Sequence, residues 1–405
     1  MKNILIYIND SLGELDWISP FVKSEEGKNF NFYIFLNGPG KTHQDKIDIL
    51  REHGLIEENI HCLNSLSKKD YYFFKLDEFS NRVLGRIKLY SIKLFELFRT
   101  FSDFVRFAGS YLINNKKVKF DYIFRDYNLK NSFSLQYYIR LNHKAKIVIF
   151  PHAVGLQKEH PDCPREAMRA IHADLWLENS DLSDIAKNTK AYKEVFFASG
   201  VPAFDINYNM KSLFDIKIKK VLIITRDCGM AFGFDYEDAY IVFKTLLKEL
   251  SGMKYEIVIK HHPRDRILQE WRKIQAQYPN IIELEGSLLN INESYSACFT
   301  LFSTAPLFLL SRHIPVFEFS PYKNITEYSD RMPMHYKSNS GLLTHDLLSL
   351  GLYKRLDDID NISTYMTKDY LSFLSSSQHQ KCKEIFPQGA NLKISNKLMG
   401  ISHEP

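Results

Sequence analysis

The residues best suited to chemistry follow one predicted buried strand in the second half of the chain. An apolar run leads directly into Lys260, His262, Pro263 and Arg264, which place cationic and titratable groups beside a helix breaker. Ligands of open α/β sheets collect outside the carboxyl ends of the strands. We therefore expect a ligand site here. His262 is preferred over His261 because the residue before a proline is held extended at the strand end.

A second strand end supplies groups that suit a phosphate. Ser303, Thr304 and Ala305 follow another predicted strand and precede a helix that is expected to begin at Pro306. Hydroxyl and backbone N–H groups at the start of a helix favour a bound anion. If these residues and His262 stand at neighbouring strand ends, they form a phosphate cradle.

The loop after the predicted strand at 221–225 is acidic and contains two glycines. Its candidate site residues are Arg226, Asp227, Gly229, Asp235 and Asp238. Asp238 could simply favour the dipole of the helix that follows. Asp235 comes a few residues earlier and is the best placed of the acids to reach a ligand.

Two further strand ends add candidates. Glu318 and Phe319 follow the strand at 314–317 and offer aromatic and backbone groups to a base or a ribose. In the first half of the chain, the strand at 146–150 leads to His152 and Glu159. The sequence contains neither a P-loop nor a dinucleotide-binding glycine fingerprint, so these loops would have to hold a nucleotide without one.

The order of predicted strands and helices favours an α/β protein with two Rossmann-like domains and a cleft between them. We place the first domain at residues 1–205, a polar linker at 206–220 and the second domain at 221–326. Residues 327–405 read as a C-terminal helical segment that packs back across the domains. A long helical pattern with one basic face covers residues 83–113, which indicates a core helix or a surface that docks an acceptor or a membrane.

Composition narrows the class of partner. The chain has 405 residues, a formal net charge of +5 and scattered cysteines without a metal-binding spacing. We find no nucleic-acid-binding signature, no signal peptide and no apolar run long enough to span a membrane. The expected location is the cytoplasm, with peripheral attachment at the inner membrane as an open alternative.

The two Rossmann-like halves, the K-x-H-P-type loop and the F-S-T-A loop resemble GT-B glycosyltransferases that use CMP-activated sugars. The pattern is most similar to the bacterial retaining β-Kdo transferases of lipopolysaccharide and capsule assembly. This resemblance implies CMP-β-Kdo as the donor and an oligosaccharide or lipid-linked glycan as the acceptor. It implies no cofactor and no metal.

The resemblance also implies roles for individual residues. His262 would bind the departing phosphate, and Ser303 and Thr304 would help to hold it. Asp235 would attack the anomeric carbon, with Asp227 and Asp238 as alternatives. Glu159 would face the acceptor hydroxyl. Trapping of the sugar by a carboxylate, followed by a second displacement, would give retention of configuration.

Three alternatives stay open. Bacterial sialyltransferases and polysialyltransferases share the His-Pro and Ser/Thr loops and would use an aspartate as a base, with inversion. CDP-glycerol-type phosphotransferases have a related His-Pro loop. A non-catalytic protein that binds a glycan or a nucleotide within an assembly complex is the third.

Overall fold

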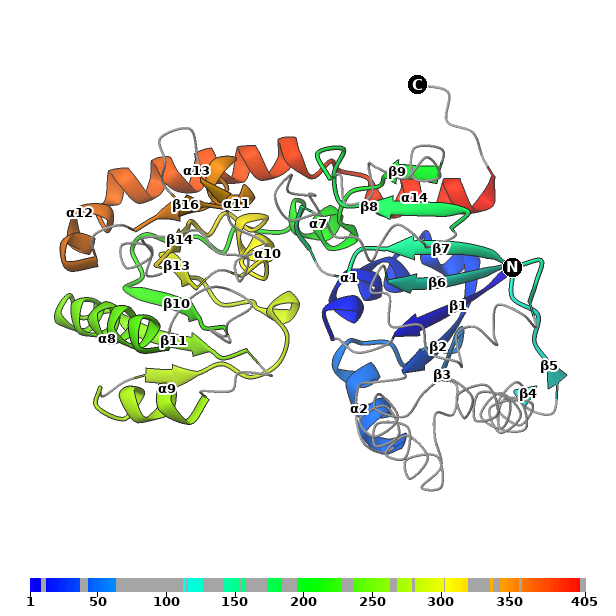
Figure 1. Ribbon diagram of the computed structural model, residues 1–405, viewed down its shortest axis with the longest axis horizontal. Coiled ribbons are helices and arrows are strands. Elements are labelled where there is room, and N and C mark those ends of the chain that lie inside the picture. Colours follow the sequence, from blue (N-terminus) through cyan, green and yellow to red (C-terminus); the bar gives the residue numbers. More distant parts are fainter. Residues whose placement is uncertain are drawn as a thin grey trace, which may run out of the picture.

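The computed structural model describes most of both halves of the chain. The described residues are 1–8, 12–36, 43–62, 112–113, 116–126, 142–152, 154–156, 173–183, 195–226, 236–262, 268–278, 281–301, 303–319, 336–337, 343–356 and 359–400. The two halves lie side by side, each built around its own sheet (Figure 1).

The first sheet has seven strands in the order β3-β2-β1-β6-β7-β8-β9, all parallel. Its strands are β1 (Lys2–Ile8), β2 (Phe30–Leu36), β3 (Ile60–Cys62), β6 (Tyr122–Asp126), β7 (Lys146–Phe150), β8 (Leu175–Glu178) and β9 (Phe196–Ala198). Its central strands are almost continuously apolar and buried, as expected for a parallel sheet that is covered on both faces.

The second sheet has six parallel strands in the order β12-β11-β10-β13-β14-β17. They are β10 (Lys220–Ile224), β11 (Glu256–Lys260), β12 (Ile281–Glu283), β13 (Ala297–Thr300), β14 (Val316–Glu318) and β17 (Lys354–Arg355). Strand order reverses between β1 and β6 in the first sheet and between β10 and β13 in the second. Each sheet therefore has the switch point at which doubly wound folds bind ligands.

Helices connect and cover the strands. They are α1 (Leu12–Lys23), α2 (His43–Glu52), α7 (Pro202–Asn207), α8 (Tyr236–Gly252), α9 (Leu268–Gln275), α10 (Leu307–Leu310), α11 (Asp346–Ser349), α12 (Ile362–Tyr365), α13 (Lys368–Ile385) and α14 (Ala390–Met399). Short 3-10 turns are η1 (Gly27–Asn29), η4 (Leu288–Asn290) and η6 (Ile359–Asn361), and two small antiparallel pairs are β4 (Leu112–Ile113) with β5 (Lys116–Lys117) and β15 (Tyr336–Lys337) with β16 (Leu343–Thr344). Among the described residues, no helix combines the length and the apolar character needed to cross a membrane.

The carboxyl ends of the two sheets point toward each other. In Figure 1 the arrowheads of β1, β6 and β7 point toward the second half, and those of β10 and β11 point back. Ser287, before η4, lies with its Oγ 3.1 Å from Oδ1 of Asp16 in α1. Asn290 donates to the carbonyl of Glu52 at 3.5 Å. The segment after β12 in the second half therefore contacts helices α1 and α2 of the first half.

The last two helices return the chain to the first half. The long helix α13 starts beside the second sheet and leads to α14 next to β8 (Figure 1). Tyr122 of β6 donates its hydroxyl to the carbonyl of Leu398, and Lys2 Nζ lies 2.6 Å from the same oxygen. Residue 205, which we predicted to be the last residue of the first domain, lies within α7. Helix α14 and strand β6 are thus held together although they are far apart in the sequence.

Two local predictions differ from the structure. Residues 112–113 form β4, so the helical pattern predicted for 83–113 does not extend to its end; its residues 83–111 lie outside the described residues. Strand β17 is absent from the predicted order because Lys354 and Arg355 carry no apolar pattern. It exists because it pairs with Phe317 and Glu318 of β14, a long-range contact that local sequence does not encode.

We expect Asp205→Ala to destabilise the docking of α14. The Asp205 carboxylate accepts hydrogen bonds from the backbone N–H groups of Gly389, Ala390 and Asn391 at 2.7, 3.0 and 2.8 Å. Losing a charged cap of this kind costs about 2 kcal/mol or more. Urea unfolding measures the change. Asp48→Ala, which removes an exposed partner of Arg51, is the control and should stay within about 0.5 kcal/mol of the wild type. Equal effects of the two variants would contradict this role of Asp205.

Candidate active site at the facing ends of the two sheets

The Ser303–Ala305 loop follows β13 in the second half. Strand β10 lies between β13 and β11, so this loop and His262 do not stand at neighbouring strand ends, as the phosphate cradle had required. Tyr353 donates its hydroxyl to the carbonyl of Ser303 at 2.8 Å, and the N–H of Ala305 donates to Ser303 Oγ at 3.3 Å. Ser303 is buried, whereas Thr304 and Ala305 are partly exposed. The predicted helix begins at Leu307 and has four residues, so any anion binding here depends on the loop and its neighbours rather than on a long helix dipole.

The two histidines after β11 have different environments. His261 is buried; its Nδ1 lies 2.9 Å from Thr225 Oγ1, and its Nε2 lies 3.0 Å from Gln275 Oε1. Both ring nitrogens of His261 therefore have hydrogen-bond partners within the second half. His262 is partly exposed, and its role as the ligand-binding histidine stays a prediction.

Lys260, the last residue of β11, interacts electrostatically with carboxylates from both halves of the chain. Burial lowers the pKa of Lys260, and the carboxylates of Asp16, Glu283, Glu285 and Glu52 oppose that effect. Asp16 and Glu52 belong to the first half. The positive charge at the end of β11 is therefore stabilised by carboxylates of both halves.

Two residues predicted for donor binding have interior side chains. Glu318 is fully buried, and its Oε2 lies 2.6 Å from Nε2 of the buried His345. Phe319 is fully buried and packs against Phe243. The Phe319 ring was predicted to contact a nucleotide, but here it packs in the core. At the end of β14, the side chains of Glu318 and Phe319 both point into the interior.

The remaining predicted residues divide into two groups. Arg226 is partly exposed after β10, and Asp238 lies in the first turn of α8, where it suits the helix dipole. The others lie outside the described residues: Asp227, Gly229, Asp235, Glu159, Pro263 and Arg264. Their proposed roles stay predictions.

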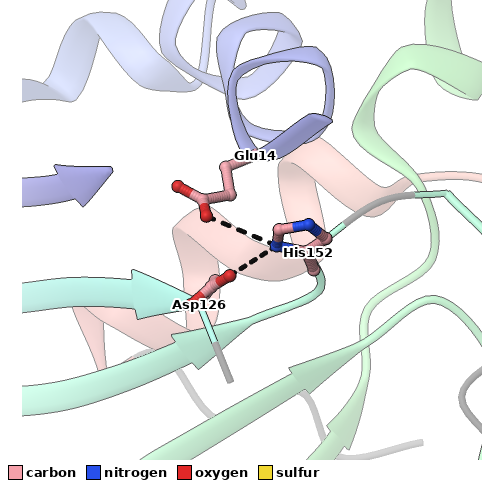
Figure 2. A group of neighbouring side chains, drawn as sticks. All are labelled: Glu14, Asp126 and His152. Carbon is pink, nitrogen blue, oxygen red and sulfur yellow. Dashed lines mark hydrogen bonds and ion pairs between the residues drawn. The ribbon is translucent and has the colours of Figure 1, made fainter. Parts of the chain in front are cut away.

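The first half contributes a cluster of three titratable side chains, Glu14, Asp126 and His152 (Figure 2). Glu14 lies in the first turn of α1, directly after β1. Asp126 ends β6, and His152 follows β7. His152 Nδ1 lies 2.5 Å from Asp126 Oδ2 and 3.3 Å from Glu14 Oε1. Because β1 and β6 flank the switch point, the fold places these groups where it usually binds a ligand.

Burial and mutual contact set the protonation of this cluster. Burial raises the pKa of Glu14 to about 8, against the opposing hydrogen bond with His152. Burial alone would lower the pKa of His152, but hydrogen bonds with Asp126 and Glu14 raise it to about 9. Glu14 and His152 therefore both hold their protons to a higher pH than the free side chains do. Its ligand atoms lie within 4.8 Å of one another, so a divalent cation could replace these protons.

Two hydrogen bonds and one close approach connect the loop that contains His152 to the second half. Trp17 Nε1 donates to Asn179 Oδ1 at 2.6 Å, and Asn179 Nδ2 donates to the carbonyl of Gly155 at 2.7 Å. Gly155 has φ +147°, and a Cβ built there would lie 2.9 Å from Thr304 Cγ2. The loop after β7 and the loop after β13 therefore touch, so His152 and Ser303–Ala305 belong to one region.

His152 was predicted only as a secondary candidate, and Glu14 and Asp126 were not predicted. Asp126 directly follows the predicted strand at 121–125, so its position at a strand end was visible in the sequence. Glu14 lies six residues beyond the strand at 4–8, and no comparable signal marks it.

We expect Gly155→Ala to disturb the junction between the halves. The positive φ disfavours any side chain, and the new methyl group would press on Thr304. We expect a loss of about 1 to 3 kcal/mol of stability, measured by thermal unfolding. Gly252→Ala is the control, because nothing lies within 4 Å of a Cβ at that position. An unchanged Gly155→Ala protein would contradict the contact.

We expect Glu14→Gln to flatten the dependence of stability on pH. Glu14 has a raised pKa, so the folded protein holds more protons than the unfolded chain between about pH 4.5 and 8, and stability falls as pH rises through that range. Because the pKa of His152 is also raised, the stability of the folded protein continues to fall until about pH 9. Urea unfolding from pH 5.5 to 9 should show a smaller decline for Glu14→Gln than for the wild type or for the exposed control Glu57→Gln. Equal declines in all three proteins would contradict the protonated state of Glu14.

The fold itself is found in known proteins. No protein-family profile matches the sequence, and no curated protein matches it. Among solved structures, the S. aureus MnaA–UDP co-structure is similar with a TM-score of 0.60 and 13% identity, covering 100% of this chain and 99% of that one. A UDP-N-acetylglucosamine 2-epimerase is similar with a TM-score of 0.55 and 14% identity, covering 100% of this chain and 99% of that one. CalG4, the calicheamicin glycosyltransferase, is similar with a TM-score of 0.51 and 10% identity, covering 99% of this chain and 98% of that one. The architecture is that of the GT-B glycosyltransferase fold.

Proposed function

We propose that this protein transfers a sugar from a nucleotide-activated donor to a glycan acceptor. The observation that carries the proposal is the contact of Gly155 with Thr304, which joins a strand-end loop of each sheet. A donor phosphate near Ser303–Ala305 would therefore have the titratable groups of the first half close by. The GT-B fold agrees with this reaction, although fold alone does not define function.

The finer proposal is that the donor is CMP-β-Kdo. Lys260, His262 and Arg264 would oppose the charge of the departing CMP phosphate, together with Ser303 and Thr304. Asp235 would attack the anomeric carbon of the keto sugar as the C–O bond to phosphate breaks, forming a sugar ester of the aspartate. The acceptor hydroxyl would then displace Asp235 as Glu159 takes its proton, which restores the carboxylate and retains the configuration.

A transfer assay tests the reaction. The protein is incubated with CMP-Kdo that is generated in situ and a short glycan acceptor, and mass spectrometry looks for an acceptor heavier by one Kdo residue. CMP-sialic acid is run in parallel. Product from CMP-sialic acid alone would favour the inverting sialyltransferase or polysialyltransferase. No product from either donor would count against CMP-sugar transfer.

Calorimetry with nucleotides separates the other candidates. CMP should bind more tightly than UDP if the donor is CMP-Kdo. UDP is included because the similar MnaA structure contains UDP. Preferential binding of CDP and CDP-glycerol would favour the CDP-glycerol-type phosphotransferase. Binding of a nucleotide without turnover of any donor would favour the non-catalytic partner.

A further inference from the structure

A buried histidine of the first half, His53, has an oxygen acceptor at each of its ring nitrogens. It directly follows α2 and is 7% exposed. Its Nδ1 lies 2.9 Å from the carbonyl oxygen of Ile49, and its Nε2 lies 3.2 Å from Oδ1 of Asp16. A neutral imidazole has one N–H group and donates to one of these oxygens, whereas an imidazolium donates to both. With Asp16 ionised, both contacts are therefore hydrogen bonds only when His53 is protonated.

The same oxygen of Asp16 also binds the second half of the chain. Ser287 Oγ accepts from the backbone N–H of Leu289 at 3.2 Å and donates its own hydrogen to Asp16 Oδ1 at 3.1 Å. Ser287 begins the segment 287–291, which contains η4 and is called the η4 segment below. Asp16 thus joins His53 to the η4 segment.

A second contact joins the η4 segment to the same place. Asn290 Nδ2 donates to the carbonyl of Glu52, the residue before His53, at 3.5 Å. The η4 segment therefore meets the first half at Asp16 of α1 and at the end of α2.

The contacts of His53 favour its protonated form. Burial alone would lower the pKa of His53, but the hydrogen bond with Asp16, the charge of Asp16, the Ile49 carbonyl and the charge of Glu52 raise this pKa above its ordinary value of 6.5. The raised pKa agrees with the two acceptors at the ring.

Other charged groups near this junction come from both halves. Lys260, at the end of β11, interacts with Asp16 and with the carboxylates of Glu52, Glu283 and Glu285. Lys23 of α1 lies close to the residue after His53, since a Cβ built at Gly54 would be 3.4 Å from Lys23 Nζ. Among these side-chain types, histidine alone has an ordinary pKa near neutrality. His53 is therefore the group whose charge changes there.

Loss of the His53 proton removes one of its two hydrogen bonds. A lone pair of the ring then faces either the Ile49 carbonyl or the Asp16 carboxylate, and both arrangements are unfavourable. The Asp16 side chain is 31% exposed, so water competes for it once its cationic partner is lost. Because the pKa of His53 is raised in the folded protein, the stabilisation is present at low pH and is lost as pH rises through that pKa.

We propose that His53, Asp16 and Ser287 form a protonation-dependent latch between the two halves of the chain. The His53 imidazolium fixes Asp16, Asp16 holds Ser287, and removal of the proton releases the η4 segment from α1 and α2. The latch goes beyond the proposed transfer reaction and does not depend on the identity of the donor. Since Asp16 also interacts with Lys260, the latch lies beside the strand end predicted to bind the donor phosphate.

Hydrogen–deuterium exchange of the wild-type protein from pH 5 to 9 tests the latch. The readout is the protection of the η4-segment amides, relative to their intrinsic exchange rates at each pH. We expect this protection to fall roughly 10-fold as pH rises, as for the loss of a hydrogen bond to a charged group. The amides of α8 report global opening in the same samples.

His53→Gln separates the latch from global effects of pH. Glutamine keeps a neutral N–H donor that does not titrate in this range. The protection of the η4 segment should therefore vary by less than about two-fold from pH 5 to 9, while α8 follows the same pH profile as in the wild type. His143→Gln, which replaces an exposed histidine of the same half, is the matched control and should show the wild-type fall.

Asp16→Asn tests the link between the histidine and the η4 segment. Asparagine keeps an oxygen acceptor for Ser287 but removes the charge. NMR of ring-labelled histidine should show the pKa of His53 above 6.5 in the wild type and closer to 6.5 in Asp16→Asn. The fall in protection of the η4 segment should move to lower pH by the same amount.

Protection of the η4 segment that does not change with pH would overturn the inference, as would a His53→Gln protein that shows the wild-type fall. A His53 ring that titrates while the η4 segment is unaffected would show that this histidine stabilises only the first half, and it would overturn the latch as well. The wild-type profile and Asp16→Asn decide the question even if His53→Gln fails to fold.

Discussion

Replacing Asp235 by alanine is expected to reduce transfer by roughly 10³-fold or more, because the proposed reaction loses its nucleophile. Affinity for CMP should change little, since the aspartate is assigned to the sugar and not to the nucleotide. The change should therefore appear in kcat. Initial rates of transfer with donor generated in situ, together with calorimetry for CMP, measure the two effects separately.

The neighbouring acids provide the control for this experiment. Asp227→Ala and Asp238→Ala are made in parallel, because both were alternatives for the same role. Asp238 lies in the first turn of α8, so its replacement should cost some helix stability and leave most of the transfer rate. A large loss in Asp238→Ala or Asp227→Ala, with an active Asp235→Ala protein, would move the nucleophile to that residue.

The second large effect is expected from His262→Ala, which should lower kcat by roughly 10²- to 10³-fold. The imidazole is proposed to stabilise the charge that develops on the departing phosphate, and that charge is greatest in the transition state. Binding of CMP should also weaken, because the free nucleotide carries the same phosphate. The observation behind this prediction is that His262 is partly exposed at the end of β11 while its neighbour is buried.

His261→Ala is the matched control for His262→Ala. His261 hydrogen-bonds to Thr225 and Gln275 inside the second half, so its loss should lower the melting temperature and have a smaller effect on kcat of the folded fraction. If His261→Ala reduced kcat more than His262→Ala did, with both proteins folded, the assignment of the two histidines would be reversed.

Local sequence patterns predicted the fold well where strands are buried and apolar. The strands around Ile4, Val148, Leu222 and Val258 are in the core, because a parallel sheet covered on both faces needs continuous apolar runs. The prediction of two Rossmann-like halves and C-terminal helices is confirmed by the two parallel sheets and their order. Strand β17 was missed because its existence depends on pairing with β14 rather than on its own residues.

The site was harder to predict than the fold. Glu14 and Asp126 are separated by more than a hundred residues, and only the pairing of β1 with β6 brings their strand ends together. Phe319 was expected to face a nucleotide, but it and the preceding Glu318 are both buried, because the end of β14 is covered on both faces by tertiary packing that the local sequence does not reveal. Strand ends identify where chemistry can occur; the side-chain contacts decide which residues take part.

The covalent route is tested most directly by intact-protein mass spectrometry after incubation with CMP-Kdo generated in situ and no acceptor. We expect a protein heavier by one Kdo residue, with release of CMP. The adduct should be absent from Asp235→Ala and should disappear when acceptor is added. Transfer to an acceptor without any adduct would contradict the covalent route through Asp235. Neither an adduct nor release of CMP from any CMP-sugar would contradict the central claim that this protein is a CMP-sugar-dependent transferase.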